Sequence, residues 1–233
     1  MNSPLTILLG LHKSTSKTGQ LIPRHDTPTI TYGKLTVYFG GMFSGKTDAV
    51  EAHIDRARHA RINWQAFKPA NDTRHGTESA RSRRGNGQVG FDVTPIDPKF
   101  PHDILQKIDN DTRLIVLDEV QFFHTSLLSV VDQIRRAGIT VIAAGLDLDY
   151  LGRPFGSTLT LAATATDARK LTAICMVCRH HEAPFSQMIN VDGTPVTHDI
   201  YNDGSSVAIE GPTTYEARCG HCFVWPTPPP PTY

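Results

Sequence analysis

A glycine-rich segment that ends in a lysine is the first part of the sequence that could do chemistry. Residues 40–47 read GGMFSGKT and fit the phosphate-loop pattern G-x-x-x-x-G-K-[ST]. Its glycines let backbone N–H groups turn toward phosphate oxygens, Lys46 supplies a positive charge, and Thr47 offers a hydroxyl to Mg²⁺. A chance glycine-rich turn is the alternative. The ATP-binding loop is expected to comprise Gly40, Gly41, Met42, Phe43, Ser44, Gly45, Lys46 and Thr47.

Two adjacent carboxylates follow an apolar strand further along the chain. Residues 114–117 are four consecutive apolar residues, as in a strand buried on both faces of a parallel sheet. Asp118 comes next, at the carboxyl end where α/β proteins bind ligands, and can hold a water of Mg²⁺. Glu119 is either a solvated carboxylate or a general base that accepts a proton from an acceptor hydroxyl. Beside a phosphate loop, this pair predicts phosphoryl transfer with Mg²⁺ and ATP.

All four cysteines fall into two C-x-x-C pairs, Cys175 with Cys178 and Cys219 with Cys222. Four thiolates in two such pairs are typical of a tetrahedral structural zinc site, and a pair of redox dithiols is the alternative. Three neighbouring histidines could replace a cysteine as ligands: His180, His181 and His221. The separation of the two pairs exceeds that of a compact zinc ribbon, so we expect zinc to hold the base of a long loop.

Alternating strands and helices must position these residues. Strands are expected over 34–39, 62–68, 113–119 and 139–147, and helices over 48–61, 100–108 and 127–138. A polar stretch over 69–90 reads as a mobile loop. The alternation predicts an α/β fold: a phosphate-loop NTPase (RecA-like) parallel sheet with a small C-terminal zinc-binding lobe.

Composition limits the remaining possibilities. The 233 residues carry 23 basic and 23 acidic side chains, so no net field favours a polyanion, and no nucleic-acid partner is expected. The sequence has no run of 18 apolar residues and no cleavage site after its short apolar N-terminal stretch, which argues against a membrane partner. We therefore expect a cytoplasmic protein.

Six motifs give the chain a resemblance to a known family. They are MFSGKT, DEVQFF, GLDLDYLGRPFG, CMVC, SQ and YEARCGHC. Their order and spacing resemble those of the cellular-type, zinc-containing thymidine kinases over about residues 34–225. The resemblance implies a thymidine kinase that uses ATP with Mg²⁺, carries structural Zn²⁺, and forms a homotetramer. A kinase for another nucleoside and a nucleotide-switched binding module remain alternatives.

The resemblance also implies roles for single residues. Glu119 would be the catalytic base and Asp118 the Mg²⁺ partner, with Gln121 and Arg74 near the nucleotide. The substrate-binding residues would be Met42, Phe122, Leu146, Tyr150, Phe155, Ser186, Ser206, Ala208 and Tyr215. The implied domains are a flexible extension (1–33), a phosphate-loop kinase domain (34–172), a zinc-binding lobe with a substrate-covering loop (173–225) and a proline-rich tail (226–233).

Overall fold

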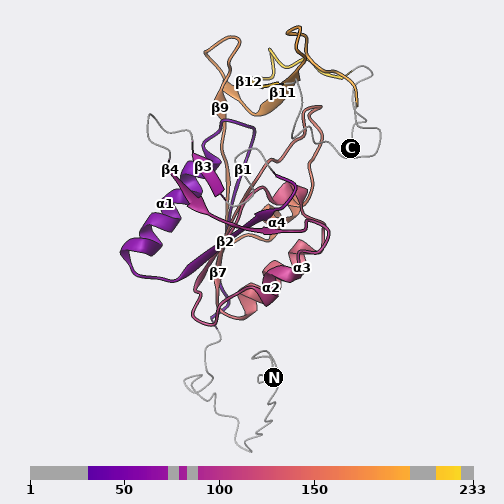
Figure 1. Ribbon diagram of the computed structural model, residues 1–233. Coiled ribbons are helices and arrows are strands. Elements are labelled where there is room, and N and C mark those ends of the chain that lie inside the picture. Colours follow the sequence, from indigo (N-terminus) through magenta and orange to yellow (C-terminus); the bar gives the residue numbers. More distant parts are fainter. Residues whose placement is uncertain (1–30, 73–78, 83–88, 200–213, 227–233) are drawn as a thin grey trace, which may run out of the picture.

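Six parallel strands form the central sheet of the protein (Figure 1). The structure is a computed structural model and describes residues 31–72, 79–82, 89–199 and 214–226. The sheet order is β5-β2-β6-β7-β1-β8, with β1 Leu35–Phe39, β2 Trp64–Pro69, β5 Thr94–Ile96, β6 Leu114–Leu117, β7 Thr140–Gly145 and β8 Asp167–Lys170. The helices are α1 Lys46–His59, α2 Asp103–Gln106, α3 Leu127–Arg136 and α4 Thr158–Thr164. This arrangement confirms the predicted α/β fold with a parallel sheet.

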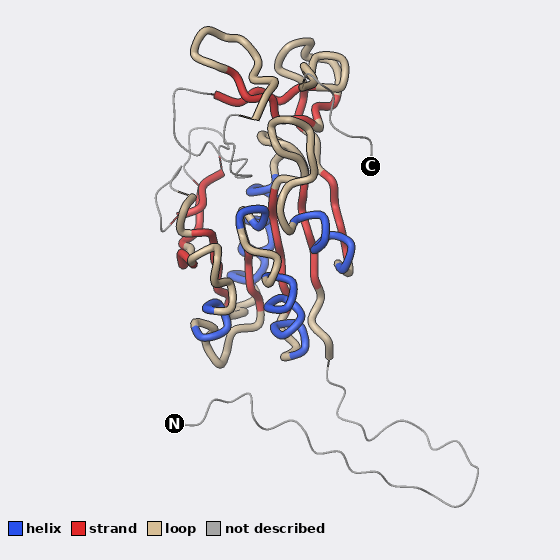
Figure 2. Tube along the Cα trace, turned by 90° about the vertical axis from the view of Figure 1, so that its right-hand side faces the viewer, coloured by secondary structure: helices blue, strands red, loops and turns tan. Residues whose placement is uncertain are grey.

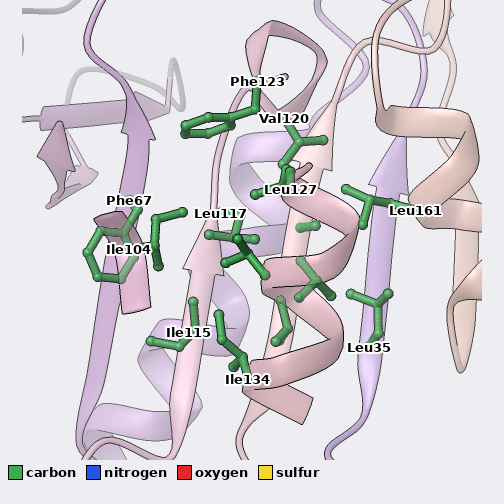
Figure 3. Packing of buried hydrophobic residues seen from close by; sticks show 14 of the residues in the cluster. Leu35, Phe67, Ile104, Ile115, Leu117, Val120, Phe123, Leu127, Ile134 and Leu161 are labelled. Carbon is green, nitrogen blue, oxygen red and sulfur yellow. The ribbon is translucent and has the colours of Figure 1, made fainter. Parts of the chain in front are cut away.

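Helices cover both faces of the sheet because successive strand residues point to opposite sides. In β6, Leu114 and Val116 pack with α1, whereas Ile115 and Leu117 pack with α2, α3 and α4. Figure 3 shows the second of these clusters, with Leu127 and Ile134 of α3 against the strands. All four β6 residues are buried, as the apolar run predicted. Each such side chain contributes about 1.5–3 kcal/mol through burial, which fixes the ends of the strands where the polar residues lie.

The edges of the sheet differ from the prediction. The four expected strands are β1, β2, β6 and β7, but β5 and β8 at the two edges were missed, and so was α4. In β8 the sequence DARK is charged and mostly exposed, which suits an edge strand but hides the apolar pattern. The loop expected over 69–90 is also wrong in part, because β3 (Ser79–Ser82) and β4 (Val89–Asp92) pair as antiparallel strands. Phe91 of β4 is buried beside α1, which explains why this segment packs against the helix.

Two small sheets follow the central one and form a lobe. They are β9 (Ala173–Ile174) with β10 (Glu182–Ala183), and β11 (Phe185–Ile189) with β12 (Thr214–Arg218). Figures 1 and 2 show this lobe beyond one end of the central strands. The four cysteines cluster in it, and this confirms the small C-terminal lobe of the predicted fold. Within the described ranges, no helix is long and apolar enough to cross a membrane.

The described end of the predicted N-terminal extension contacts α3. The Tyr32 hydroxyl donates to Asp132 Oδ1 at 2.5 Å, and the Arg135 guanidinium lies 4.3 Å from the centre of the Tyr32 ring. Arg135 Nε also donates to the Gly33 carbonyl at 2.9 Å. Residues 31–33 are thus attached to the sheet domain just before β1.

Candidate functional site

The glycine-rich loop lies between β1 and α1, where the sequence pattern places it. Gly40 has φ +138°, and a Cβ there would collide with the Leu171 carbonyl oxygen, so the loop needs glycine at this position. Gly45 has φ +83° and is the N-cap of α1, a left-handed conformation that glycine adopts without strain. The chain therefore turns from strand to helix within a few residues. The N-terminal end of α1, with its partial positive charge, begins where the loop ends.

The side chain of Lys46 lies over this loop. Its ammonium donates to the carbonyl oxygens of Gly40 at 3.0 Å and Gly41 at 2.7 Å, and to Ser44 Oγ at 3.4 Å. These contacts hold the positive charge of Lys46 against the backbone of the glycine-rich loop. Thr47, the second predicted Mg²⁺ residue, is the next residue of α1.

Residues 118–123, which we call the carboxylate turn, leave the carboxyl end of β6. Asp118 Oδ1 accepts the backbone N–H of Glu119 at 3.0 Å, which ties the two predicted site residues together. Glu119 has φ +52° and ψ +44°, a left-handed conformation that costs a non-glycine residue about 1–3 kcal/mol. The turn then continues as a 3₁₀ helix, η2 (Val120–Phe122), whose Val120 is buried against the sheet. Packing of η2 thus holds the strained turn in place, and Figure 3 shows Val120 and Phe123 above β6.

Five of the predicted pocket residues fall into two groups. Phe122 and Phe155 touch edge to face, with ring centroids 5.6 Å apart, and Leu146 lies directly after β7. Tyr150 and Tyr215 instead belong to a second cluster with Leu151, Met188 and Val196, which joins residues 150–151 to β11 and β12 of the lobe. Tyr150 is only 2% exposed, and its hydroxyl donates to the His198 carbonyl at 3.4 Å. Arg74, Ser206 and Ala208 lie outside the described residues.

The lobe touches the glycine-rich loop directly. The hydroxyl of Ser186, in β11, accepts the backbone N–H of Met42 at 2.8 Å. A Cβ on Gly41 would lie 3.1 Å from the Pro184 carbonyl oxygen, so the two backbones are close. Met42 and Ser186, both predicted to bind the substrate, are therefore neighbours, and Met42 also belongs to the predicted ATP-binding loop.

An ion-pair network that the sequence analysis missed fixes the chain beside the lobe. Arg153 Nε donates to Asp149 Oδ2 at 2.7 Å, and its Nη1 donates to Asp199 Oδ2 at 3.1 Å. Asp149 is buried and also accepts the backbone N–H groups of Leu151 and Arg153 at 2.9 Å each. The four-residue spacing of Asp149 and Arg153 could have indicated their ion pair. Asp199 is too distant in sequence for its ion pair with Arg153 to be predicted from spacing.

The four cysteines have the geometry of a metal site. Four sulfurs at about 2.3 Å from a tetrahedral zinc ion lie about 3.8 Å from one another. The Sγ atoms of Cys178 and Cys219 are 3.8 Å apart, and all four Sγ atoms lie within 4.8 Å of one another. The four residues are free thiols. Cys175, Cys178, Cys219 and Cys222 could therefore hold a zinc ion, as predicted.

Three of these thiols, Cys175, Cys178 and Cys222, have shifted pKa values, and the shifts of Cys178 and Cys222 are large. The pKa of Cys178 falls to about 5, because the backbone N–H of His180 and the side chain of His181 hydrogen-bond its sulfur. The pKa of Cys222 rises to about 12, because of desolvation and hydrogen bonds with the neighbouring thiols. His181 Nδ1 lies 3.4 Å from Cys178 Sγ, so this histidine supports a cysteine sulfur. A divalent cation among the four sulfurs would favour deprotonation of all of them.

The core of the lobe explains why a metal would be useful there. Among the described residues, the buried cluster around the four sulfurs consists of alanines and cysteines: Ala173, Cys175, Ala183, Ala217 and Cys219, with Cys178 and Cys222 packed against them. Such small side chains bury little apolar area, and small units of this kind are commonly stabilised by a structural zinc.

The fold and the site together define a class of protein. The protein has an α/β fold. A glycine-rich loop and two carboxylates lie at the carboxyl ends of its parallel strands, and a four-cysteine lobe contacts the loop. Within this class the chain belongs to the thymidine kinase family, which matches residues 33–223. The resemblance given by the six motifs is confirmed. Family membership implies a kinase, with thymidine and ATP as its substrates.

Proposed function

We propose that the chain transfers the γ-phosphate of ATP to the 5′-hydroxyl of thymidine, giving thymidine monophosphate for pyrimidine deoxynucleoside salvage in the cytoplasm. The observation that carries this proposal is that three features lie together at the carboxyl ends of the parallel strands. They are the lysine-containing loop after β1, the carboxylate turn after β6, and the cysteine lobe that reaches the loop through Ser186 and Met42. The same resemblance to zinc-containing thymidine kinases supports a homotetramer.

Different residues of the site bind the phosphates, accept the proton and hold the metal ion. Backbone N–H groups of the loop and the ammonium of Lys46 bind the phosphates of ATP, and Glu119 accepts the proton of the 5′-hydroxyl. The 5′-oxygen forms a bond to the γ-phosphorus as the bond from that phosphorus to the β,γ-bridging oxygen breaks, and ADP leaves. Thr47 and Asp118 would hold Mg²⁺, which neutralises charge on the β- and γ-phosphates when it is bound.

In this proposal the nucleoside binds between the carboxylate turn and the lobe. The edge-to-face pair of Phe122 and Phe155 offers an aromatic wall for a base, and Leu146 lies beside the turn. The chain between β11 and β12, which begins after Ile189 and returns at Thr214, would cover the base. Closing such a loop costs conformational entropy, and holding both of its ends reduces that cost.

A panel of nucleosides tests the reaction. Release of ADP by the purified protein is expected to depend on added nucleoside and to be fastest with thymidine, compared with deoxyuridine and deoxycytidine. The reason is that phosphoryl transfer requires an acceptor hydroxyl beside Glu119. A faster rate with another nucleoside would change the assigned substrate. ADP release that is unaffected by any nucleoside would instead favour a nucleotide-switched binding module.

Loss of a cysteine should affect thymidine more than ATP. In Cys219→Ser, we expect the zinc content to fall well below that of the wild type and thymidine affinity to drop more than ATP affinity. The cysteines flank the loop between β11 and β12, whereas the phosphate loop is built on the central sheet. Because a structural zinc also stabilises the fold, the thermal unfolding midpoint should decrease as well.

Val177→Ser is the matched control for this change. Val177 lies between Cys175 and Cys178, is 52% exposed, and offers no ligand to a metal. Metal content by atomic emission and separate titrations with ATP and thymidine, on the soluble fraction of each variant, give the comparison. Equal loss of both affinities in folded Cys219→Ser would contradict the role of the lobe in holding the nucleoside loop.

A further inference from the structure

Gln121 has both ends of its side-chain amide engaged, although it is almost completely buried. The side chain belongs to η2, and the residue is 3% exposed. Its Oε1 accepts the backbone N–H of Leu146 at 2.9 Å, and its Nε2 donates to Glu119 Oε2. Because Leu146 N–H can only donate, the end of the amide that faces it must be the oxygen. The amide NH₂ group is therefore directed at the carboxylate of Glu119.

The backbone around Gln121 is shaped to hold this amide. A Cβ on Gly145, the last residue of β7, would lie 2.8 Å from Gln121 Oε1 and 2.6 Å from Thr158 Oγ1. A Cβ on Gly156, which has φ +55°, would collide with the carbonyl oxygen of Gln121. Only glycine fits at both positions, so the side chain and the backbone of Gln121 are each confined by a close neighbour.

Glu119 needs such support because its own backbone does not fix the carboxylate. The left-handed backbone of Glu119 is held by the bond from its N–H to Asp118 Oδ1, but its side chain still has three rotatable bonds. The bond from Gln121 restricts the carboxylate itself. Gln121 thereby connects the carboxylate of Glu119 to the end of β7, a buried strand in the middle of the sheet.

We propose that Gln121 is a positioning residue for phosphoryl transfer, which holds the carboxylate of Glu119 in its reactive position from the end of β7. This inference rests on the proposed function, in which Glu119 is the base. It differs from the expectation that Gln121 binds the nucleotide, because both ends of its amide are engaged within the protein. Precise placement matters for such a group, since a displacement of about 1 Å can cost about 10²-fold in rate.

Gln121→Glu separates positioning from a purely structural role. The variant keeps the shape of the side chain and an oxygen for Leu146 N–H, but it places a second carboxylate against Glu119 in place of the donor. We expect kcat to fall by about 10-fold or more, with the KM values for ATP and thymidine within about threefold of the wild type. Gln133→Glu, the same chemical change on the outer part of α3, should leave both parameters unchanged.

A double-mutant cycle shows whether Gln121 acts through Glu119. Once Glu119→Gln has removed the base, adding Gln121→Glu should cause little further loss of kcat, because the two residues act as a unit. Additive losses would overturn the proposal, and so would a raised KM for ATP with kcat unchanged. Gln121→Asn, which is neutral but too short to reach both partners, serves if circular dichroism shows that Gln121→Glu does not fold.

The cycle also separates the failure of this inference from the failure of the proposed function. If Glu119→Gln itself retains wild-type kcat, Glu119 is not the base and both proposals fall. If Glu119→Gln is slow while folded Gln121→Glu and Gln121→Asn turn over as the wild type does, only the positioning role is overturned.

Discussion

Replacing Glu119 with glutamine is expected to lower kcat by about 10²-fold or more, within the range that general bases usually contribute. The substitution removes the proton acceptor and keeps the shape of the side chain. Its amide oxygen can still accept from Gln121 Nε2, and the backbone bond to Asp118 Oδ1 does not involve the side chain. ATP affinity should therefore change little. Steady-state kinetics and an ATP titration on the same preparation check both statements.

Glu182→Gln is the matched control for this substitution. Glu182 lies in β10 and is exposed, so the same chemical change there should leave kcat as it is. A loss in Glu119→Gln that matches the control would mean that the carboxylate has no part in proton transfer. A large loss of ATP affinity would instead place Glu119 among the groups that bind the nucleotide.

The central part of the fold was predictable because burial leaves a clear pattern there. Residues 114–117 are apolar without interruption, and they form β6 with all four side chains buried. On α1, Val50, Ile54 and Ala57 share one face and are buried. At the edges of the sheet this signal disappears. Residues 167–170 are charged and mostly exposed, so β8 is a strand only because its backbone pairs with β1. The local sequence of residues 167–170 does not indicate this pairing.

The candidate site was predictable where one segment supplies all of its parts. The loop over 40–47 and the adjacent carboxylates could be read from spacing alone, because a strand end and a helix start position them. The contact of Ser186 with Met42 could not be derived that way, since 144 positions separate the two residues. The same holds for the contact of Gln121 with Leu146, the residue after β7, because 25 positions separate the two residues. These contacts depend on tertiary packing, which cannot be derived from the local pattern of a single sequence.

Lys46→Ala should be the second most damaging change, and it should affect binding as well as turnover. The ammonium lies 3.0 Å from the Gly40 carbonyl and 2.7 Å from the Gly41 carbonyl, and thus at the loop assigned to the phosphates. Removing its charge weakens the interaction with ATP in the ground state and in the transition state alike. We expect kcat/KM for ATP to fall by about 10² to 10³, comparable with the loss of a preorganised donor in other active sites.

Lys99→Ala distinguishes this effect from a general loss of positive charge. Lys99 is exposed after β5, and its backbone N–H is held by Asp97 Oδ1 at 2.9 Å, so its side chain can be shortened without disturbing the turn. ATP affinity by calorimetry and turnover by ADP release, measured for both variants, give the comparison. Since Lys46 also donates to the loop carbonyls, the thermal unfolding midpoint of Lys46→Ala must be measured alongside. If the variant is folded and retains both ATP affinity and rate, then the loop over residues 40–47 is not where the phosphates bind.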